Sequence, residues 1–493
     1  MSVENIFGFE QSYATELEGF YVPWQGASVP EPRVVQLNHP LAAELGLDAD
    51  VLASDDGARL LAGMDPPAGT TPLAQAYAGH QFGNFVPQLG DGRALLLGEL
   101  IDRAGARWDL QLKGSGRTPF SRGGDGKAGL GPVLREYLMS EAMHALGVPT
   151  TRALAAITTG EEVRRPQSVE PGAIIARVAS SHIRVGTFQF FAARGESERV
   201  RLLAEYTIAR HFPDLVDADD RYLRLLGAVR DRQAALVAHW MSIGFVHGVM
   251  NTDNTTVAGE TIDYGPCAFM DGYDLGTVFS SIDRHGRYAY GNQPAIAQWN
   301  LARLAETLLP LIEPDDEERA IELATTEVDA YAGIYLERWL ERVRAKLGLL
   351  EALPGDEELI RELFGVLEGK DVDFTAFFRR LSSAARGDRT PVRMLFREKG
   401  EIDGWMDRWL TRLEGEGGDA ASRADAMDRV NPLYIPRNHN VQAALDAAID
   451  GELEPFRRLL TVLARPFEER DGLGAFTERA PDSFGSYTTF CGT

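Results

Sequence analysis

A glycine-rich run between residues 114 and 131 constrains this chain more than any other stretch. Seven of these 18 residues are glycine. Because glycine has no side chain to pack and loses the most backbone freedom on folding, such a run excludes a helix or a central strand. Arginine, lysine and aspartate interleave with the glycines, whereas flexible linkers are usually rich in serine. The run therefore predicts a loop whose backbone NH groups and cationic side chains cradle a polyphosphate, with a flexible linker as the alternative.

The elements on either side of this run follow from their patterns. Residues 108–113 alternate apolar and polar side chains, which indicates a strand with Lys113 on its polar face. Residues 132–147 begin with proline and end with glycine, as helices often do. Glu136 and Glu141 lie on this helix. A strand lysine paired with a helix glutamate orients the lysine toward phosphates in kinases. The alternative for either glutamate is a solvated helix face.

A shorter glycine motif precedes that strand. Gly90 and Gly92 flank Asp91, and this turn signal predicts a hairpin that leads into an apolar strand. A plain β-turn is the ordinary interpretation of such a motif. The functional interpretation is a loop that lies close to phosphates, with Arg93 at its edge.

Two arginines lie in a predicted strand further along the chain. Residues 174–178 are apolar enough for a buried strand, and residues 180–188 are expected to continue it. Arg177 and Arg184 fall inside these segments, and a buried arginine needs a partner. An internal carboxylate is the ordinary partner, and a nucleotide phosphate is the functional one.

A polar loop that begins at Phe245 carries most of the candidate chemistry. It holds Asp253 and Asn254 between apolar segments, and Asp263 follows shortly after. Carboxylate and amide oxygens of this kind hold Mg²⁺ on nucleotide phosphates. The order of residues resembles the catalytic loop and metal-binding triplet of protein kinases, H-x-D-x-x-x-x-N followed by D-F-G. One position departs from that pattern, because Val249 stands where a kinase has its catalytic aspartate.

The composition argues against several classes of protein. The net charge is −23, and an acidic surface repels phosphate backbones, so no nucleic-acid partner is expected. No apolar run approaches the roughly 18 residues that span a bilayer, and the start has no signal-peptide pattern. We therefore expect a cytoplasmic protein without membrane association. The two cysteines, Cys267 and Cys491, form no disulfide framework. Two unrelated thiols are the ordinary interpretation, and a redox-sensitive bridge between them is the alternative.

Helices are predicted to dominate after residue 190. They are expected over 198–210, 223–243, 295–312, 316–347, 356–367, 373–383, 401–413 and 439–450, with a loop over 427–438. The predicted class is α+β. We assign residues 1–190 to a unit with the strands and glycine-rich segments, 191–345 to a helical unit with the polar loops, and 346–493 to a helical extension with a tail.

Together these motifs resemble the selenoprotein O (YdiU) family of kinase-like adenylyltransferases. The segments that carry the resemblance are 88–93, 112–122, 246–254 and 263–265, with further similarity at 431–438 and in the tail that contains Cys491. The resemblance implies a protein-kinase-like bilobal fold with a mixed N-lobe, a large helical C-lobe and a C-terminal helical extension. It also implies that ATP binds in a flipped orientation. AMP is then transferred to Ser, Thr or Tyr hydroxyls of proteins, and pyrophosphate is released.

The resemblance also implies a role for individual residues. Asp253 is the implied base, Asn254 and Asp263 bind Mg²⁺ or Mn²⁺, and Lys113 and Glu136 form the ion pair that positions the phosphates. The residues implied to line the nucleotide are Gly90, Gly92, Arg93, Asp125, Gly126, Arg177 and Arg184. A reversed nucleotide accounts for the valine in the kinase-like loop, because the base must then lie elsewhere.

Two other functions use the same residues. One is a phosphotransferase that binds ATP in the ordinary orientation, against which Val249 counts. The other is a catalytically inactive nucleotide-binding scaffold, which would have no need of Asp253, Asn254 and Asp263 together. The expected partners are protein substrates, with self-modification among the possibilities, and the expected assembly is a monomer.

Overall fold

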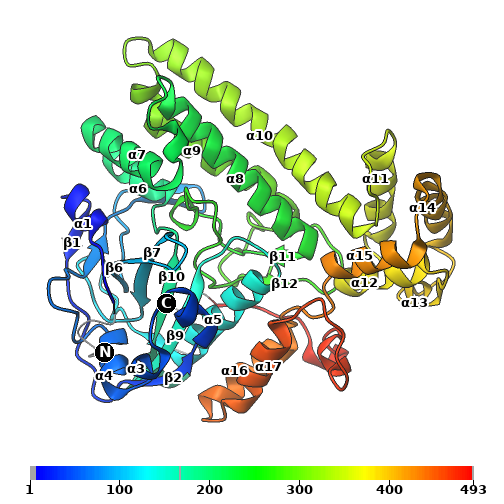
Figure 1. Cartoon of the computed structure of the whole chain (residues 1–493), viewed down its shortest axis with the longest axis horizontal. Helices are drawn as coiled ribbons and strands as arrows, with labels where there is room; N and C mark the ends of the chain where they lie inside the picture. Colours follow the sequence, from blue (N-terminus) through cyan, green and yellow to red (C-terminus); the bar gives the residue numbers. More distant parts are fainter. Residues whose placement is uncertain (1–6, 166–167, 491–493) are drawn as a thin grey trace.

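The computed structural model describes residues 7–165 and 168–490, and it is a mixed α+β chain with an antiparallel sheet. The main sheet has the strand order β1-β3-β6-β7-β10-β9-β2, and β8 pairs with β10. Its strands are β1 (Tyr21–Pro23), β2 (Arg33–Leu37), β3 (Leu73–Gln75), β6 (Ala94–Ile101), β7 (Arg107–Lys113), β8 (Ala128–Gly129), β9 (Arg152–Arg165) and β10 (Ser168–Ala179). The sheet and the long helices occupy different regions of the molecule (Figure 1).

The two faces of the sheet have different environments. On one face, Leu110 and Leu112 of β7 join a buried apolar cluster with residues of the short helices α2 (His39–Glu44), α3 (Ala49–Leu52) and α4 (Asp55–Leu61). On the other face, α5 (Leu130–Ala145) packs against β9 and β10. The predicted alternation in β7 is confirmed, since Lys113 points to the α5 face, where it meets Glu136.

Three long helices form the core of the helical region (Figure 1). They are α8 (Arg221–Ile243), α9 (Gln293–Ile312) and α10 (Glu317–Lys346), with α1 (Ser12–Glu16), α6 (Val185–Ala192) and α7 (Ser197–His211) on the sheet side. Helix α8 ends at Gly244, whose φ of 73° suits glycine. The chain then forms a short ladder of β11 (Phe245–Val246) and β12 (Ala268–Phe269), and the candidate loops lie between these two strands.

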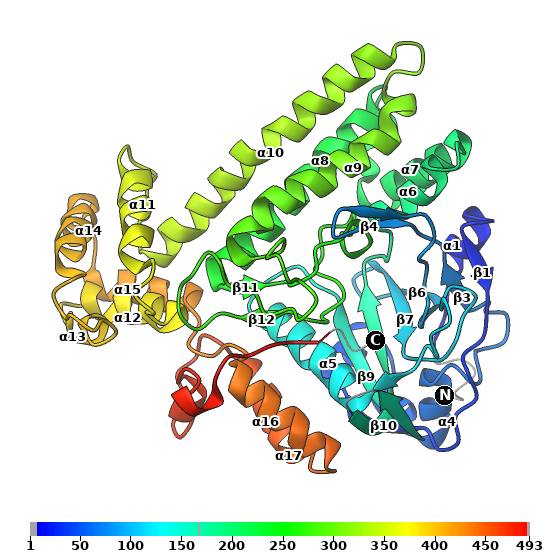
Figure 2. The same cartoon turned by 180° about the vertical axis from the view of Figure 1, so that it is seen from behind.

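The C-terminal helices form two groups. The first lies at the far end of α10 and consists of α11 (Asp356–Leu367), α12 (Phe374–Ala385), α13 (Thr390–Arg393), α14 (Asp403–Glu416) and α15 (Ala420–Val430). The second consists of α16 (Asn438–Ile449) and α17 (Glu454–Leu463), which pack against α5. The segment after α17 then runs back to the sheet, so the tail lies near the candidate loops (Figure 2).

The structure corrects three local predictions. Residues 180–188 do not continue β10, because Arg184 caps the start of α6. Gly90 and Gly92 do not connect a hairpin into β6, since the partners of β6 in the sheet are β3 and β7. Residues 427–430 are the last turn of α15 rather than a loop.

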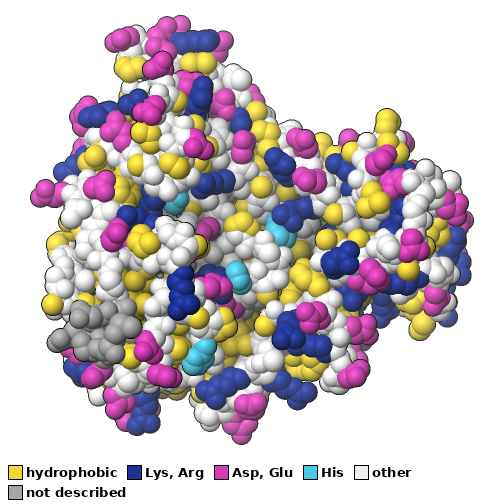
Figure 3. All heavy atoms as spheres, viewed as in Figure 1, with side chains coloured by type: hydrophobic (Ala, Val, Ile, Leu, Met, Phe, Trp, Pro, Cys, Tyr) yellow, Lys and Arg dark blue, Asp and Glu magenta, His cyan; other side chains and the backbone are white. Residues whose placement is uncertain are grey.

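The surface carries both signs of charge. Acidic and basic side chains are interspersed over the face shown in Figure 3. None of the helices in the described part of the chain combines the length and apolarity that a bilayer crossing requires.

Candidate active site

A cavity of about 430 Å³ lies where the sheet meets the loops between β11 and β12. The sheet contributes Ala94, Lys113 and Arg177 to its wall, and the loop before β6 contributes residues 91–93. The loops contribute a second set of wall residues, namely Val249, Asn251, Asp253, Asn254, Asp263, Gly265 and Pro266. Segments far apart in the sequence therefore bring most of the predicted site residues to one cavity.

Asp263 is surrounded by three cationic side chains. Its Oδ1 accepts from Lys113 Nζ at 2.9 Å and from Arg177 Nη1 at 2.6 Å, and its Oδ2 accepts from Arg184 Nη1 at 3.1 Å. Glu136 shares two of these cations, at 2.7 Å from Lys113 and 3.0 Å from Arg177. Lys113 and Glu136 thus form the predicted ion pair.

The cationic side chains around Asp263 affect the pKa of its carboxyl more strongly than its burial does. Burial alone would raise the pKa of its carboxyl, but Lys113, Arg177 and Arg184 hold that pKa well below its usual value. The backbone of Asp263 has φ of 62°, in the left-handed region that a side chain disfavours. Such strain persists only where the surroundings hold the residue, as this cluster does.

Asp253 has the opposite environment, although it lies only ten residues away. Its side chain is buried, and its Oδ1 has no hydrogen-bond partner within the described residues. Burial raises the pKa of Asp253 to about 6, and the nearby Arg184 only partly opposes this effect. A carboxyl with an open oxygen and a pKa near neutrality is suited to accept a proton.

Two contacts fix the loops relative to each other. Arg184 Nη1 donates to the Asp253 carbonyl at 2.7 Å as well as to Asp263, and its guanidinium lies 4.5 Å from the ring centroid of Tyr77. His247 Nε2 donates to the Ile262 carbonyl at 3.1 Å, directly before Asp263. These contacts therefore hold Asp253, the candidate base, in a fixed position relative to Asp263.

The glycine-rich loop after β7 is folded on itself. A Cβ at Gly126 would lie 2.0 Å from the Gly116 carbonyl oxygen, so only glycine fits there. Asp125 pairs with Arg165 on β9 at 2.8 Å, and Lys127 pairs with Glu161. Asp125 and Gly126 line neither the large cavity nor the smaller one beside α5, so their implied nucleotide contacts have no counterpart in these cavity walls.

The shorter glycine motif packs against that loop. A Cβ at Gly90 would lie 2.3 Å from the Phe120 ring, and one at Gly92 would lie 3.0 Å from the Phe120 carbonyl oxygen. Gly92 and Arg93 line the large cavity, whereas Gly90 does not. The glycines therefore serve close packing of two loops, and Asp91 and Arg93 are the members of the motif with ionisable groups at the cavity.

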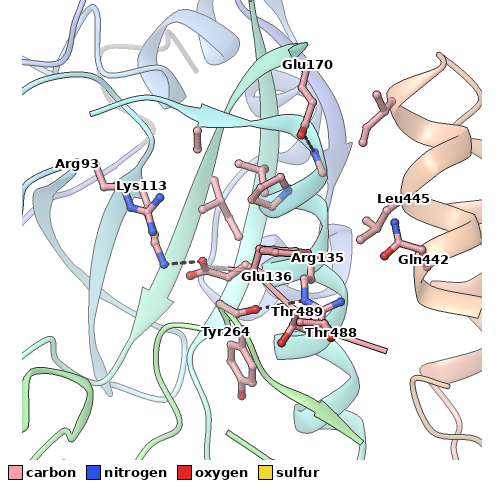
Figure 4. Close-up of a pocket in the computed structure, with 18 of the residues that line it drawn as sticks. Arg93, Lys113, Arg135, Glu136, Glu170, Tyr264, Gln442, Leu445, Thr488 and Thr489 are labelled. Carbon is pink, nitrogen blue, oxygen red and sulfur yellow. Dashed lines mark hydrogen bonds and ion pairs between the residues drawn. The ribbon is translucent and has the colours of Figure 1, made fainter. Parts of the chain in front are cut away.

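A second cavity of about 210 Å³ adjoins the first at Arg93 and Lys113 (Figure 4). It lies between the first turns of α5, helix α16 and the tail. Arg135 of α5 donates to the Gly265 carbonyl at 3.3 Å and to the Tyr487 hydroxyl at 2.9 Å. The other helix glutamate, Glu141, pairs with Arg152, which identifies it as a structural residue.

The tail contacts the loop that follows Asp263. Thr489 Oγ1 donates to the Pro266 carbonyl at 2.7 Å, and the Thr489 amide donates to the Phe279 carbonyl at 2.8 Å. Cys267 is buried, and burial raises the pKa of its thiol to about 11. Cys491 lies outside the described residues, so the hypothesis of a bridge between the two cysteines stays a prediction.

Sequence reasoning missed three residues of this site. Gln111 Oε1 accepts from Arg177 at 2.9 Å and 2.6 Å, and Gln111 Nε2 donates to Asp91 Oδ2 at 3.2 Å. Asp91 and Tyr77 line the large cavity. The signal for Gln111 was its position on the same strand face as Lys113, two residues away.

The donors at the cavity fit a hard divalent cation. No cluster of three or more His, Cys, Asp or Glu side chains is found among residues 7–165 and 168–490 that could hold a metal by itself. Mg²⁺, however, is usually held by one or two protein oxygens together with substrate phosphates and water. Asn254 and Asp263 line one cavity and supply such oxygens. The residues therefore fit an ion that binds together with a nucleotide.

Comparison with known proteins agrees with this arrangement. The profile of a family described as "Protein adenylyltransferase SelO" matches residues 5–464. Several bacterial relatives are named "Protein nucleotidyltransferase YdiU". The one from Cereibacter sphaeroides (strain ATCC 17029 / ATH 2.4.9) is 59% identical over 488 residues, which cover 99% of this chain and 100% of the relative. The one from Rhizobium leguminosarum bv. trifolii (strain WSM2304) is 56% identical over 491 residues, covering 99% and 97%.

A relative from Mycobacterium sp. (strain KMS) is 57% identical over 482 residues, covering 98% of each chain. The protein is therefore an enzyme of the nucleotidyltransferase class. The chain belongs to the SelO family of protein adenylyltransferases, whose activity implies ATP as a substrate.

Proposed function

We propose that this protein transfers AMP from ATP to Ser, Thr or Tyr hydroxyls of other proteins and releases pyrophosphate. The observation that carries the proposal is the Asp253 carboxylate, which is buried at the cavity with one oxygen unpartnered. No acidic side chain stands at Val249, where a kinase would hold its base for attack on the γ-phosphate. The acidic side chain that is available as a base is therefore Asp253, and it is not at position 249.

In the proposed reaction the acceptor oxygen forms a bond to the α-phosphorus of ATP. The bond from that phosphorus to the α–β bridging oxygen breaks, and pyrophosphate leaves with the electron pair. Asp253 Oδ1 takes the proton of the acceptor hydroxyl. A base with a pKa of about 6 is mostly ionised at neutral pH and is ready for this task.

The cations around Asp263 have a second use in this proposal. Lys113, Arg177 and Arg184 hold a carboxylate in the structure, and the same donors suit the phosphate oxygens of ATP. Arg93 extends this positive wall toward the second cavity. Asn254 and Asp263 would hold Mg²⁺ or Mn²⁺, which supplies neutralisation of the phosphate charge when bound.

We also propose a protein-kinase-like bilobal fold for the chain. Residues 1–190 would form the N-lobe, 191–345 the C-lobe, and 346–493 the helical extension. The Lys113–Glu136 pair between a strand and a helix supports this proposal, as does the cavity between the sheet and the loops after α8. We further propose that the enzyme acts as a monomer and that its own hydroxyls are among its acceptors.

ATP labelled separately on the α- and γ-phosphates tests the proposed reaction. The protein is incubated with a bacterial lysate, ATP and Mg²⁺ or Mn²⁺, and the labelled proteins are separated. We expect label from α-ATP alone, and a mass increase of one AMP on the modified peptides. Label from γ-ATP alone would instead establish a phosphotransferase, and labelling from neither would leave a nucleotide-binding scaffold.

A further inference from the structure

The hairpin β4 (Gly79–Gln81) and β5 (Asn84–Val86) contacts both the large cavity and a cluster of cationic and aromatic side chains. Phe82 at its turn lines the cavity. On the cluster side, four residues form what we call the arginine–tryptophan surface, namely Phe85, Arg287, Trp299 and Arg303.

Two guanidinium groups share one indole in this surface. The Cζ atoms of Arg287 and Arg303 each lie 5.0 Å from the ring centroid of Trp299. His80 contacts Trp299 edge-on at 5.2 Å and Phe85 at 5.0 Å. The Phe85 side chain remains 40% exposed. Arginine and aromatic residues of this kind are enriched where proteins bind other proteins.

The described residues neutralise the positive charge of this surface only in part. Within the described residues, Arg287 has no ion-pair partner, and its Nε is buried without a hydrogen-bond partner. Arg303 pairs with Glu306 on the next turn of α9 at 2.6 Å. The whole chain has a net charge of −23, so a cationic area beside the site contrasts with the average surface. An acidic partner would be repelled by the average, acidic surface of the chain and attracted to the arginine–tryptophan surface.

The surface is continuous with the loop that holds the proposed base. The His80 amide donates to Thr252 Oγ1 at 2.7 Å, and the Phe82 amide donates to Asn251 Oδ1 at 3.0 Å. Gly79 lies so close to the base that a Cβ there would be 2.5 Å from Asp253 Oδ1. A polypeptide that places a hydroxyl near Asp253 therefore passes close to this hairpin.

We propose that the arginine–tryptophan surface binds acidic side chains that flank the acceptor hydroxyl in the protein substrate. The inference rests on the proposed transfer of AMP to protein hydroxyls, and it names the class of sequence that is preferred. Arg287 would bind a carboxylate through two NH groups, and Arg303, which already pairs with Glu306, would add a second cation beside it. Trp299 and Phe85 would exclude water from these contacts.

Synthetic peptides with a central Ser, Thr or Tyr test this inference. One set has Asp and Glu around the acceptor, and a matched set has Asn and Gln at the same positions. Transfer from α-labelled ATP is measured as kcat/KM for each peptide. We expect the acidic set to be preferred about tenfold, mainly through KM, because two charged pairs at a surface give modest affinity.

Charge reversal identifies the residues responsible. We expect Arg287→Glu and Arg303→Glu each to reduce the acidic preference about threefold or more, and Arg287→Lys to retain most of it. Arg338→Glu is the matched control, because Arg338 forms an exposed pair with Glu341 at the same spacing as Arg303 with Glu306. ATP binding, measured by equilibrium dialysis, should be unchanged in all four variants. Should Arg287→Glu fail to fold, Arg303→Glu at the partly buried pair with Glu306 still decides the result.

Two results would overturn the inference. One is equal kcat/KM for acidic and neutral peptides with the wild-type protein, and the other is an acidic preference that survives Arg303→Glu as well as it survives Arg338→Glu. Both leave AMP transfer intact, so they reject the docking surface alone. If α-labelled ATP labels no peptide and no lysate protein, the proposed function fails, and the docking surface fails with it.

Discussion

Two carboxylates at this site, Asp253 and Asp263, lie on neighbouring loops and have opposite electrostatic environments. Asp263 accepts from three cationic side chains, and its pKa is held well below the usual value. Asp253 has an oxygen without a hydrogen-bond partner among residues 7–165 and 168–490, and burial raises the pKa of this carboxyl to about 6. Arg184 touches both loops, yet its side chain is directed to the carboxylate of one residue and to the backbone carbonyl of the other.

The difference assigns the two residues to different tasks. A carboxylate that stays ionised at any working pH is suited to organise cations and phosphates, whereas one that titrates near pH 6 is suited to take a proton. Paired acids with separated pKa values are a common sign of divided roles in an active site. The comparison therefore supports Asp253 as the base and Asp263 as the anchor, the carboxylate that organises the cations and phosphates. The variants that follow change one of these two residues or its surroundings.

Removal of the anchor should have the largest effect. Asp263→Ala leaves Lys113 and Arg177 with Glu136 as their counter-charge and removes the ion pair of Arg184, so we expect transfer to fall by more than about a thousandfold. The free energy of unfolding should fall by about 3–5 kcal/mol, because buried cations lose a partner. Chemical denaturation and α-label transfer measure the two effects.

A matched control exists for the backbone strain at that position. Asp371 also has a positive φ, 54°, and it pairs with Arg479 at the surface. Asp371→Ala should leave transfer unchanged and cost less than about 1 kcal/mol. Full activity in Asp263→Ala would remove Asp263 from the anionic and metal-binding role.

Removal of the base should reduce the chemical step with little effect on ATP binding. For Asp253→Asn we expect kcat to fall by about 10²–10⁴, the usual contribution of general-base catalysis. Asp91→Asn is the control, since Asp91 is also buried at the cavity with an unpartnered oxygen and a pKa raised by burial. Equal losses in the two variants would argue that burial of charge, rather than proton transfer, determines the rate.

The pKa of Asp253 makes a separate prediction about pH. The protonated form cannot act as a base, so kcat/KM should decrease as pH falls through about 6. The folded-state pKa is above the unfolded value of 3.8, so the stabilising contribution of this group is full below pH 4 and is lost as pH rises to about 6. Asp253→Asn should therefore be more stable than wild type by about 2–3 kcal/mol at pH 8 and similar at pH 4. A stability difference independent of pH would contradict the assignment.

The smallest expected effect concerns the support of Arg177. Gln111→Met removes the acceptor that fixes the guanidinium, so we expect KM for ATP to rise about tenfold with a smaller change in kcat. Gln75→Met, a change of the same size on the neighbouring part of the sheet, is the control for lost burial. A kcat loss that exceeds the KM change would mean that Gln111 supports the transition state instead.

Sequence patterns predicted the Lys113–Glu136 contact better than the conformation of the loops around the cavity. Alternation in β7 fixed Lys113 on the α5 side, and the turn spacing of the helix brought Glu136 within 2.7 Å of it. The helices α8 to α12 also follow from apolar periodicity. These features depend on neighbours close in sequence, which a single chain reveals.

The features that were missed depend on long-range contacts. Arg184 was expected in a strand, yet it caps α6 because its side chain reaches Asp263. The glycines at 90 and 126 suggested a phosphate cradle, whereas both are needed where backbone and rings pack closely. A glycine pattern indicates that the backbone is closely approached, but it does not indicate whether a ligand or another part of the chain lies against it. The pairing of Gln111 with Arg177 could not be derived either, since it requires the register between β7 and β10.

The wall of the large cavity includes residues as distant in the sequence as Tyr77 and Phe490. A growing polypeptide made at about 5–20 residues per second exposes the loops with Asp253 and Asp263 roughly 10–50 seconds before residue 490 is added. During that interval the buried acids and arginines can already pair, while the tail side of the wall is absent. Completion of this wall thus waits for the segment that contains Phe490, which is made after every residue that supplies the ionic contacts around Asp263.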